Sequence, residues 1–454
     1  MDRHNRIVEQ CSVLTGVKEV DQKLADVLSE KHGDYSELVL RDRVHGAIYS
    51  SQAVFEAEMS KIFHRAWLCV GHEAEIPNPG DYRVTYMGRQ SVIMVRGHDN
   101  VVRVVMNRCR HRAVTVTETD TGNQKRFSCP YHGWTYDNTG ALLSVPDQGG
   151  YGSEFRLEDN GLTPAPRMDS YRGFVFASLA ADGPTLKEHL GLAASYIDLF
   201  LDVSPTGEID VRAGVNKTFF KANWKFVGMD GYHPNYVHKT VYDTRRRKAP
   251  AGVTGSSKGE SFSDEAGNFA RDLGNGHAML DVYPVRSRDY DQYLKRMAKT
   301  PDWDEYYQAM VAAYGQARAD EILVWAGDPH IGIFPNLQLI GSQIRLIRPT
   351  AADRTEVLMF LTTLKNVPES INQLRIRNHE AFYGPASQGS PDDVEIFERT
   401  QIGLSADVNP WVLLARGLER EVVAEDGSIC GGITDETTQR GQLKQWKKMM
   451  GEAK

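Results

Sequence analysis

Two short runs of sequence each combine a cysteine with a histidine. Cys109 and His111 lie in Cys-Arg-His, and Cys129 and His132 lie in Cys-Pro-Tyr-His, with 17 residues between the pairs. In a Rieske-type [2Fe–2S] cluster two thiolates hold one iron and two imidazoles hold the other, which raises the reduction potential. Structural zinc is the alternative, since Cys₂His₂ is also a zinc set. Zinc fingers usually group like residues together, whereas each run here contributes one of each kind, so the pattern favours iron–sulfur.

A second group of candidate ligands lies in Asp-Gly-Tyr-His-Pro-Asn-Tyr-Val-His, which contains His233 and His238. Two histidines and a carboxylate with open coordination positions make the facial triad of non-haem iron(II) oxygenases. A separation of five residues is about 140° around a regular helix. Pro234 is expected to end or kink the helix and so to turn both imidazoles inward. The competing interpretation is two unrelated polar histidines in a loop broken by proline.

Three carboxylates are candidates for the remaining position of such a site. Asp230 begins the same run, and Asp392 and Asp393 follow Ser390-Pro391. Serine as N-cap, proline at the first position and acids in the first turn are typical of a helix start. Acids are favoured there by the helix dipole alone. The residues by themselves therefore leave the choice of carboxylate open.

Composition limits the class of protein. The chain of 454 residues is long enough for two or three domains, and its net charge of −7 argues against a nucleic-acid or anionic-membrane surface. No apolar stretch reaches the ~18–20 residues that a membrane span requires. The first residues lack the apolar core of a signal peptide. With only five cysteines, the sequence predicts a cytoplasmic protein.

The pattern of residues predicts an α+β chain in three parts. Residues 1–40 are expected to form a polar, partly helical arm. Residues 41–178 are expected to form an all-β domain that contains both Cys/His pairs, because 82–86, 91–95 and 101–105 are rich in β-branched and aromatic residues. Residues 179–454 are expected to form a larger domain, with an antiparallel sheet flanked by helices.

Within the larger part, 186–201 has apolar residues at helical spacing, and 249–280 is a Gly/Ser-rich stretch typical of a loop or lid. The runs 331–340 and 343–347, separated by Gly341-Ser342, predict two strands of a hairpin. A strand at 356–363 and helices after Ser390 and over 442–450 complete the expected elements.

Taken together, these motifs resemble the large (α) subunit of Rieske non-haem iron ring-hydroxylating oxygenases, most closely the benzoate/toluate and anthranilate branch. The resemblance covers most of the chain. It implies one Rieske [2Fe–2S] cluster held by the four Cys/His residues and one mononuclear Fe(II). Further segments that carry the likeness are 62–67, 71–77, 171–176, 223–225 and 341–345.

The resemblance also assigns roles to the acids. It makes Asp393 the third iron ligand beside His233 and His238. It makes Asp230 a bridging group that orients an iron-site histidine and connects it to His132 of a neighbouring subunit. One departure is that only four residues separate Lys225 from Asp230, about one helical turn fewer than in benzoate-type relatives. The missing turn includes an asparagine near the iron.

The implied function is that of a terminal oxygenase, an enzyme that adds one or both atoms of O₂ to an aromatic ring. Since the chain has no Gly-x-Gly-x-x-Gly fingerprint, electrons from NADH or NADPH must come through a separate reductase, with or without a ferredoxin. The expected assembly is a homotrimer, or a trimer with a small β subunit. The expected substrate is an aromatic carboxylate, with Arg345 or Arg348 as its partner. Pocket candidates are Val227, Met229, Ile333, Leu337 and Phe382.

Three other functions stay open. One is a Rieske monooxygenase or demethylase that acts on a methylated amine or a methoxy compound. Another is a non-catalytic Rieske electron carrier, which would leave the second group of ligands without metal. The third is a zinc-stabilised binding protein.

Overall fold

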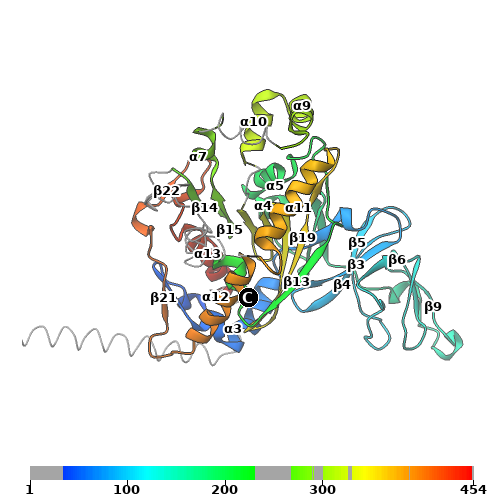
Figure 1. Cartoon of the computed structure of the whole chain (residues 1–454). Helices are drawn as coiled ribbons and strands as arrows, with labels where there is room; N and C mark the ends of the chain where they lie inside the picture. The colour runs from blue at the N-terminus through cyan, green and yellow to red at the C-terminus, as the bar shows by residue number, and fades with distance from the viewer. Residues whose placement is uncertain are drawn as a thin grey trace, which may run out of the picture.

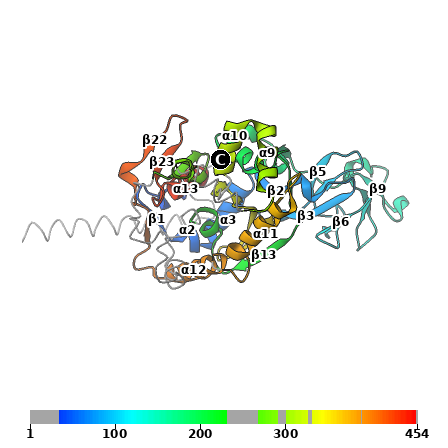
Figure 2. The same cartoon turned by 45° about the horizontal axis from the view of Figure 1, so that its top comes forward.

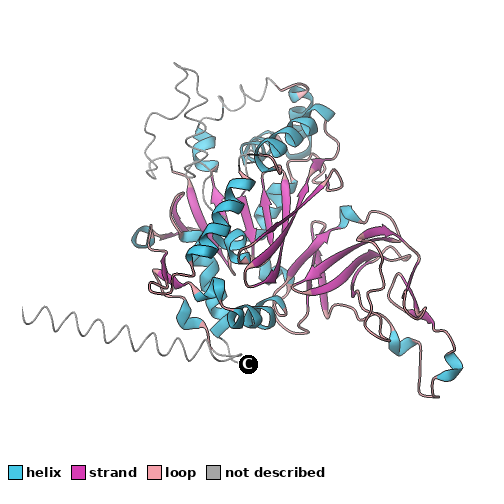
Figure 3. Ribbon diagram, turned by 60° about the horizontal axis from the view of Figure 1, so that its bottom comes forward, coloured by secondary structure: helices cyan, strands magenta, loops and turns pink. Residues whose placement is uncertain are grey.

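The computed structural model describes residues 34–230, 267–288, 290, 300–325, 330–387 and 389–451. Figure 1 shows an all-β domain that projects from a larger body. In Figure 3 the larger body is a broad sheet flanked by helices, whereas the projecting domain consists mostly of strands. The predicted fold class, an all-β domain plus a larger domain with an antiparallel sheet and helices, is confirmed.

The projecting domain contains a four-stranded sheet in the order β5-β4-β3-β6 and a three-stranded sheet β7-β8-β9. The strands are β3 (Asp81–Met87), β4 (Gln90–Arg96), β5 (Val102–Met106), β6 (Thr121–Asn123), β7 (Arg126–Ser128), β8 (Thr135–Asp137) and β9 (Leu142–Ser144). The three β-rich runs of the sequence correspond to β3, β4 and β5. A further sheet, β10-β11-β2, joins the domain to the body through β10 (Arg167–Tyr171), β11 (Phe174–Ser178) and β2 (Leu68–His72).

The body is built on a nine-stranded antiparallel sheet in the order β13-β19-β18-β17-β16-β15-β14-β23-β22. Its strands are β13 (Val215–Phe220), β14 (Phe269–Gly274), β15 (His277–Asp281), β16 (His330–Ile333), β17 (Leu337–Ile340), β18 (Gln343–Ala351), β19 (Arg354–Leu361), β22 (Val422–Val423) and β23 (Ile429–Gly432). The predicted hairpin is confirmed, because Ile340 pairs with Gln343 across Gly341-Ser342.

Two expectations about strands were wrong. The run 331–340 is two strands, β16 and β17, which pair with each other. Pro335 lies between them, and a proline has no N–H for a sheet ladder. The stretch 249–280 is not loop throughout, since its last part forms the β14–β15 hairpin. Residues 249–266 lie outside the described part of the chain.

The helix expected over 186–201 is also interrupted. It forms α4 (Leu186–Leu190) and α5 (Ala193–Leu201). Gly191, between them, has φ +47°, a left-handed conformation that glycine adopts at little cost. Apolar spacing alone does not reveal the break, because both helices bury their apolar residues in the same core.

Helices cover both faces of the large sheet. On one face α4, α5, α9 (Trp303–Tyr314) and α10 (Gln316–Trp325) pack against Leu337, Leu339, Ile344 and Leu346. Figure 2 shows α9 and α10 side by side. On the other face Ile347, Val357 and Met359 share a core with Trp224, Phe226 and the last helix, α13 (Thr437–Gly451). Residues one apart on a strand face opposite layers, so each of these strands is buried on both sides.

The all-β domain is anchored to the sheet by side chains from both parts. The Asn336 amide accepts from the Cys69 backbone N–H at 3.0 Å and donates to its carbonyl at 2.8 Å. The Arg348 guanidinium lies over the ring of Tyr86, 3.1 Å from its centroid. In the described part of the chain, no helix has the length and apolarity needed to cross a membrane.

Candidate functional site

The two Cys/His runs lie on a pair of matching loops at the tip of the all-β domain. The backbone N–H of Cys109 donates to the carbonyl of Val114, and the N–H of Ala113 donates to the carbonyl of Cys109. The second loop repeats this pattern, because Cys129 donates to Trp134 and Gly133 donates back to Cys129. Each loop thus closes five residues beyond its cysteine.

The fourth residue after each cysteine has a left-handed backbone. Gly133 has φ +71° and Ala113 has φ +64°. This conformation is uncommon for a residue with a Cβ. It turns the chain back so that the cysteine and the histidine of one loop face the same space. The alanine shows that the first loop adopts this turn without the freedom of a glycine.

The four side chains have the properties that a two-iron cluster requires. Both cysteines are buried and free of disulfides. The rings of His111 and His132 lie 4.7 Å apart between centroids. The Nδ1 atoms of both rings are buried without a hydrogen-bond partner. Buried polar atoms are almost always satisfied, so two unsatisfied imidazole nitrogens beside two thiols fit a bound metal cluster.

The aromatic residues of the second loop fix the two imidazoles. The ring of Trp134 lies parallel to that of His111, at 3° and 5.3 Å. The ring of Tyr131 lies 3.7 Å from that of His132. Tyr131 is 57% exposed, so the histidine side of the loops faces outward. A partner that docks here would approach the imidazoles rather than the buried thiols.

Tyr136 on β8 adds a hydrogen bond to one thiol. Its hydroxyl lies 3.3 Å from Sγ of Cys109 and accepts the backbone N–H of Arg110 at 3.0 Å. Burial and the contact with Cys109 raise the pKa of Tyr136. The hydroxyl therefore keeps its proton and can donate it to a thiolate.

Among the described residues, no three His, Cys, Asp or Glu side chains converge as they would on a single metal ion. Such convergence is not expected for the loops at the tip, because each iron of a Rieske cluster takes only two protein ligands.

The second candidate site is approached through η6 (Phe226–Asp230), a short π-helix. His233 and His238 lie outside the described residues. The backbone of Asp230 ends η6, and its side chain also lies outside the description. Short π-helical segments such as η6 are frequent at functional sites.

A buried carboxylate holds the residues just before η6. Glu58, on α3 (Gln52–Glu58), accepts from Lys225 at 2.6 Å, from the indole of Trp224 at 2.9 Å and from the indole of Trp446 at 2.6 Å. Neither Glu58 nor Lys225 is exposed. One carboxylate thus joins three segments that are far apart in the sequence: α3, the residues just before η6, and α13.

The helix α12 (Ser390–Gly403) presents one face to η6. The ring of Phe397 lies parallel to that of Phe226 at 6.0 Å. Gln401 accepts the backbone N–H of Asn223 at 3.0 Å. Residues four apart lie on one face of a helix, so Asp393, four residues before Phe397, lies on the face turned toward η6.

The start of α12 differs from the prediction. The expectation that Ser390 is the N-cap was wrong, since Ser390 is the first helical residue and Gly389 is the N-cap, without a side-chain cap. The Ser390 hydroxyl instead donates to the carbonyl of Tyr383 at 3.1 Å. This bond joins α12 to the end of α11 (Glu369–Tyr383).

The large sheet also contacts η6. Gln338 on β17 donates to the backbone carbonyl of Val227 in η6. Val227 and Met229, which belong to η6, are buried in the core on this face of the sheet, and their place in a substrate pocket stays a prediction. Ile333 and Leu337, however, lie in the core on the other face of the sheet. The expectation that these two line the same pocket was wrong, because alternation turns them away from η6.

The two candidate arginines also face opposite ways. Arg348 pairs with Glu356 at 3.4 Å and stacks on Tyr86 of the all-β domain. Arg345 is paired in register with Gln338 and therefore lies on the face that meets η6. Phe382, near the end of α11, is half-buried.

Two residues with evident roles lack a clear signal in the sequence. Because Thr135 and Asp137 on either side are polar, the ring of Tyr136 is expected to point inward. The sequence does not indicate that its hydroxyl contacts Cys109. Glu58 looks like Glu56, which lies on the surface of the same helix. Glu58 differs from Glu56 only in the folded protein, where residues of two distant segments donate to its carboxylate.

A cavity of about 400 Å³ lies elsewhere, between Val39–Arg41, Leu414–Glu421 and one side of α13. The α13 residues that meet η6 and Glu58 are Gln442 and Trp446. Arg440 and Lys444 line the cavity from the opposite side of the helix. The cavity is therefore separate from the η6 site.

Comparison with protein families matches both parts of the chain. Residues 66–159 match the family described as Rieske [2Fe-2S] domain, and residues 194–451 match the ring hydroxylating alpha subunit (catalytic domain). The 2-halobenzoate 1,2-dioxygenase large subunit of Burkholderia cepacia is 31% identical over 84% of this chain and 81% of its own. The anthranilate 1,2-dioxygenase large subunit of Acinetobacter baylyi is 31% identical over 83% and 80%, and the toluate 1,2-dioxygenase subunit alpha of Pseudomonas putida is 33% identical over 79% and 78%.

Solved structures share the fold. A naphthalene 1,2-dioxygenase from Rhodococcus sp. with indole bound has a TM-score of 0.76 at 25% identity, over 95% of this chain and 98% of its own. A quaternary ammonium Rieske monooxygenase has a TM-score of 0.60 at 17% identity, over 90% and 96%.

Proposed function

Because this chain belongs to the family of Rieske ring-hydroxylating oxygenase alpha subunits, we propose that it is a terminal oxygenase that cis-dihydroxylates an aromatic carboxylate. The enzyme is an oxidoreductase with a Rieske [2Fe–2S] cluster and a mononuclear iron. The observation that carries the substrate class is the set of relatives named for halobenzoate, anthranilate and toluate. All three names denote benzoates, and each alignment spans about four fifths of both chains.

In this proposal the cluster ligands are Cys109 and Cys129 on one iron and His111 and His132 on the other. The matching loops, the buried thiols and the unsatisfied Nδ1 atoms support the assignment. Two neutral imidazoles leave the cluster with less negative charge than a four-thiolate cluster has, which favours the reduced state.

The proposed ligands of the mononuclear iron are His233, His238 and Asp393, with Asp230 as the group that orients an imidazole and couples it to the cluster. The position of Asp393 on the face of α12 that meets η6 supports its assignment. Iron(II) in such a site supplies the capacity to bind and activate dioxygen beside the substrate. Apolar residues of η6, Val227 and Met229, would exclude water from the ring.

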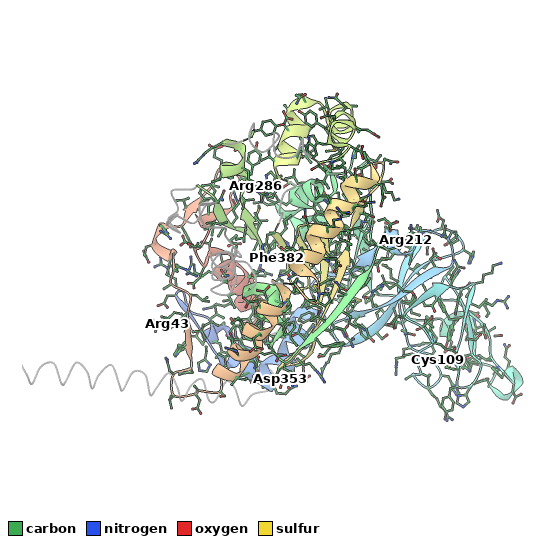
Figure 4. All side chains as sticks on the ribbon, viewed as in Figure 1. Arg43, Cys109, Arg212, Arg286, Asp353 and Phe382 are labelled. Carbon is green, nitrogen blue, oxygen red and sulfur yellow. The ribbon has the colours of Figure 1, made fainter. Side chains whose placement is uncertain are left out.

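Electrons would reach this site from a neighbouring subunit. Figure 4 shows Cys109 in the outer part of the all-β domain and Phe382 in the body, well separated within one chain. The exposed Tyr131 beside His132 leaves the cluster edge open to a partner. The proposed assembly is a homotrimer or a trimer with a small β subunit, supplied by a separate reductase with or without a ferredoxin.

The proposed reaction takes the arene, O₂, NAD(P)H and a proton to the cis-dihydrodiol and NAD(P)⁺. Both oxygen atoms enter the product, so the two electrons and two protons are balanced. The test uses the holoenzyme with an NADH-dependent reductase, benzoate-type substrates and ¹⁸O₂. Two labelled atoms per product are expected. Absence of ring oxidation on every benzoate would overturn the proposal.

A demethylase is the second candidate, favoured by the N,N-dimethyl phenylurea N-demethylase subunit alpha of Sphingobium sp., which is 37% identical over 44% of this chain. N-Demethylation puts one oxygen atom of O₂ on the methyl carbon, which leaves as formaldehyde, and the other oxygen atom is reduced to water. Formaldehyde formed from a methylated amine, with no dihydrodiol from benzoates, would favour this alternative.

A further inference from the structure

Strand β18 and helix α11 enclose a group of polar side chains whose hydrogen bonds are unmet. Gln343 is fully buried, and neither atom of its amide has a partner. Arg345 is 7% exposed with Nε unsatisfied, and His379 is 2% exposed with Nδ1 unsatisfied. We call Gln343, Arg345 and His379 the Arg345 cluster. Buried polar groups are rarely left unsatisfied, so we expect a bound ligand to supply the missing hydrogen-bond partners.

Arg345 is the unusual member. Its recorded contact within the described residues is with the ring of Tyr383, 5.2 Å from Cζ. No carboxylate or carbonyl of the described chain accepts from its guanidinium. A buried charge without a partner is unfavourable, and an anionic ligand would remove that cost. Nε is the guanidinium atom that is fully buried, so the two terminal nitrogens are the atoms through which Arg345 would bind a ligand.

The ionisable groups near Arg345 on α11 are neutral or cationic, apart from one exposed acid. Desolvation lowers the pKa of His379, so its imidazole is neutral near neutral pH. Arg375, one turn before His379, donates to the Thr362 hydroxyl at 3.1 Å. Burial lowers the pKa of Arg375 to about 10, which leaves it protonated. Glu380 is the nearby acid on α11, and its side chain is exposed to solvent.

The cluster lies between η6, which precedes the proposed histidine ligands in the sequence, and the start of α12, which carries Asp393. Across the sheet Arg345 is paired with Gln338, whose amide binds the Val227 carbonyl of η6. On its other side is Tyr383, whose carbonyl accepts from Ser390 at the start of α12. A group bound at Arg345 is thus beside η6 and the α11–α12 junction.

Arg348, on the same strand, differs from Arg345 in having a carboxylate partner among the described residues, although its Nε is also unsatisfied. Its guanidinium pairs with Glu356 and stacks on Tyr86. It faces the all-β domain rather than η6. The two arginines therefore differ in both partner and direction.

We propose that the Arg345 cluster is the carboxylate subsite of the substrate pocket. The guanidinium of Arg345 binds the carboxylate of a benzoate-type substrate, with the Gln343 amide and the His379 ring as further polar contacts. Anchoring at this end fixes which ring carbons lie next to the iron. This inference rests on the proposed function and deepens it, because it names the residues that recognise the substrate.

The experiment compares the holoenzyme with variants Arg345→Gln and Arg348→Gln. Binding of benzoate and of benzamide, its neutral analogue of the same shape, is measured anaerobically by calorimetry. Arg345→Gln should weaken benzoate about tenfold or more, the scale of a charge-assisted pair, with benzamide changed by less than about threefold. Arg348→Gln should leave both affinities unchanged.

Thermal unfolding provides a second measure that does not depend on turnover. Without ligand, Arg345→Met should be at least as stable as the natural protein, because it removes an unpaired buried charge. Benzoate should raise the Tm of the natural protein but not of this variant.

Equal loss of benzoate and benzamide binding in Arg345→Gln would overturn the subsite, and so would unchanged benzoate binding. In either case oxidation of benzoates by the natural enzyme would leave the proposed function standing. If the natural enzyme binds and oxidises no aromatic carboxylate, the proposed function itself fails.

Discussion

Glu58 and Lys225 form an ion pair of 2.6 Å in which neither side chain is exposed to solvent. The carboxylate also accepts two indole N–H groups, from Trp224 and Trp446. Burying two charges is expensive, and such a pair becomes favourable only when further hydrogen bonds satisfy it. Here the pair holds the segment that leads into η6 against α3 and α13, so it fixes where η6 begins.

Replacing Glu58 by glutamine should therefore destabilise the protein strongly. The variant removes a charge from a fully buried ion pair, and breaking a buried pair typically costs about 3–5 kcal/mol. Glu56→Gln is the matched control, because Glu56 lies on the same helix and pairs with Arg89 at 2.6 Å with both side chains well exposed. An exposed pair contributes about 1 kcal/mol or less. Urea unfolding measures both, and equal losses would contradict a special role for Glu58.

Tyr136→Phe should lower the reduction potential of the Rieske cluster. The hydroxyl lies 3.3 Å from Sγ of Cys109, and a hydrogen bond to a thiolate stabilises the reduced, more negative cluster. If the hydrogen bond stabilises the reduced cluster more than the oxidised one by about 1.4 kcal/mol, its loss lowers the potential by roughly 60 mV for one electron. A redox titration followed by EPR measures the shift. Tyr151→Phe is the control, since its ring packs on Trp134 and its hydroxyl has no recorded bond to either cysteine. A potential unchanged in Tyr136→Phe would contradict the role.

Asp393→Ala should remove the mononuclear iron and reduce turnover by at least about 100-fold, as expected when an iron ligand is lost. The iron content should fall from about three to about two per chain, with acid-labile sulfide constant at about two. His233→Ala should give the same result and keep the Rieske absorption. Asp392→Ala, at the neighbouring position of the first turn, is the control. Loss of iron in the Asp392 variant but not in the Asp393 variant would show that the carboxylate has been misassigned.

Stability should fall in mild acid because of buried histidines. Desolvation lowers the pKa of His277 from 6.5 to about 4. Its ring is held neutral between the Phe334 N–H, which it accepts at 3.0 Å, and the His189 carbonyl at 2.7 Å. Between the two pKa values the unfolded chain binds a proton that the folded chain does not. The free energy of unfolding therefore falls as the pH falls through this window, by about 3 kcal/mol in total.

Urea midpoints at several pH values from about 7 to 5 test this slope. His277→Gln should be less stable near neutral pH but should lose less stability on acidification. His98→Gln, at an exposed position, should keep the natural slope. An identical slope in all three proteins would rule out His277 as the source.

Much of the molecule could be predicted from local sequence. The types and spacing of the Cys/His pairs indicate a two-iron cluster, because few other centres take that ligand set. Alternating β-branched runs gave β3, β4 and β5, and the Gly341-Ser342 turn gave the β17–β18 hairpin. These signals depend on residues that are near each other in the chain. The break at Gly191 and the β14–β15 hairpin were missed, because a local pattern does not say where a periodic run is interrupted or paired.

What the sequence alone determined, then, is which residues could do the chemistry, with Arg345 and Arg348 left as alternative partners of a substrate carboxylate. Alternation cannot say which face meets η6, since that depends on how the sheet packs against α11 and the all-β domain. Only the tertiary structure decided that Arg348 is neutralised by Glu356 while Arg345 is buried near η6 without a counter-charge in the described chain. The same holds for Glu58, whose partners lie more than 160 residues away in the sequence. Contacts of that range come from the packing of whole elements, and no single segment encodes them.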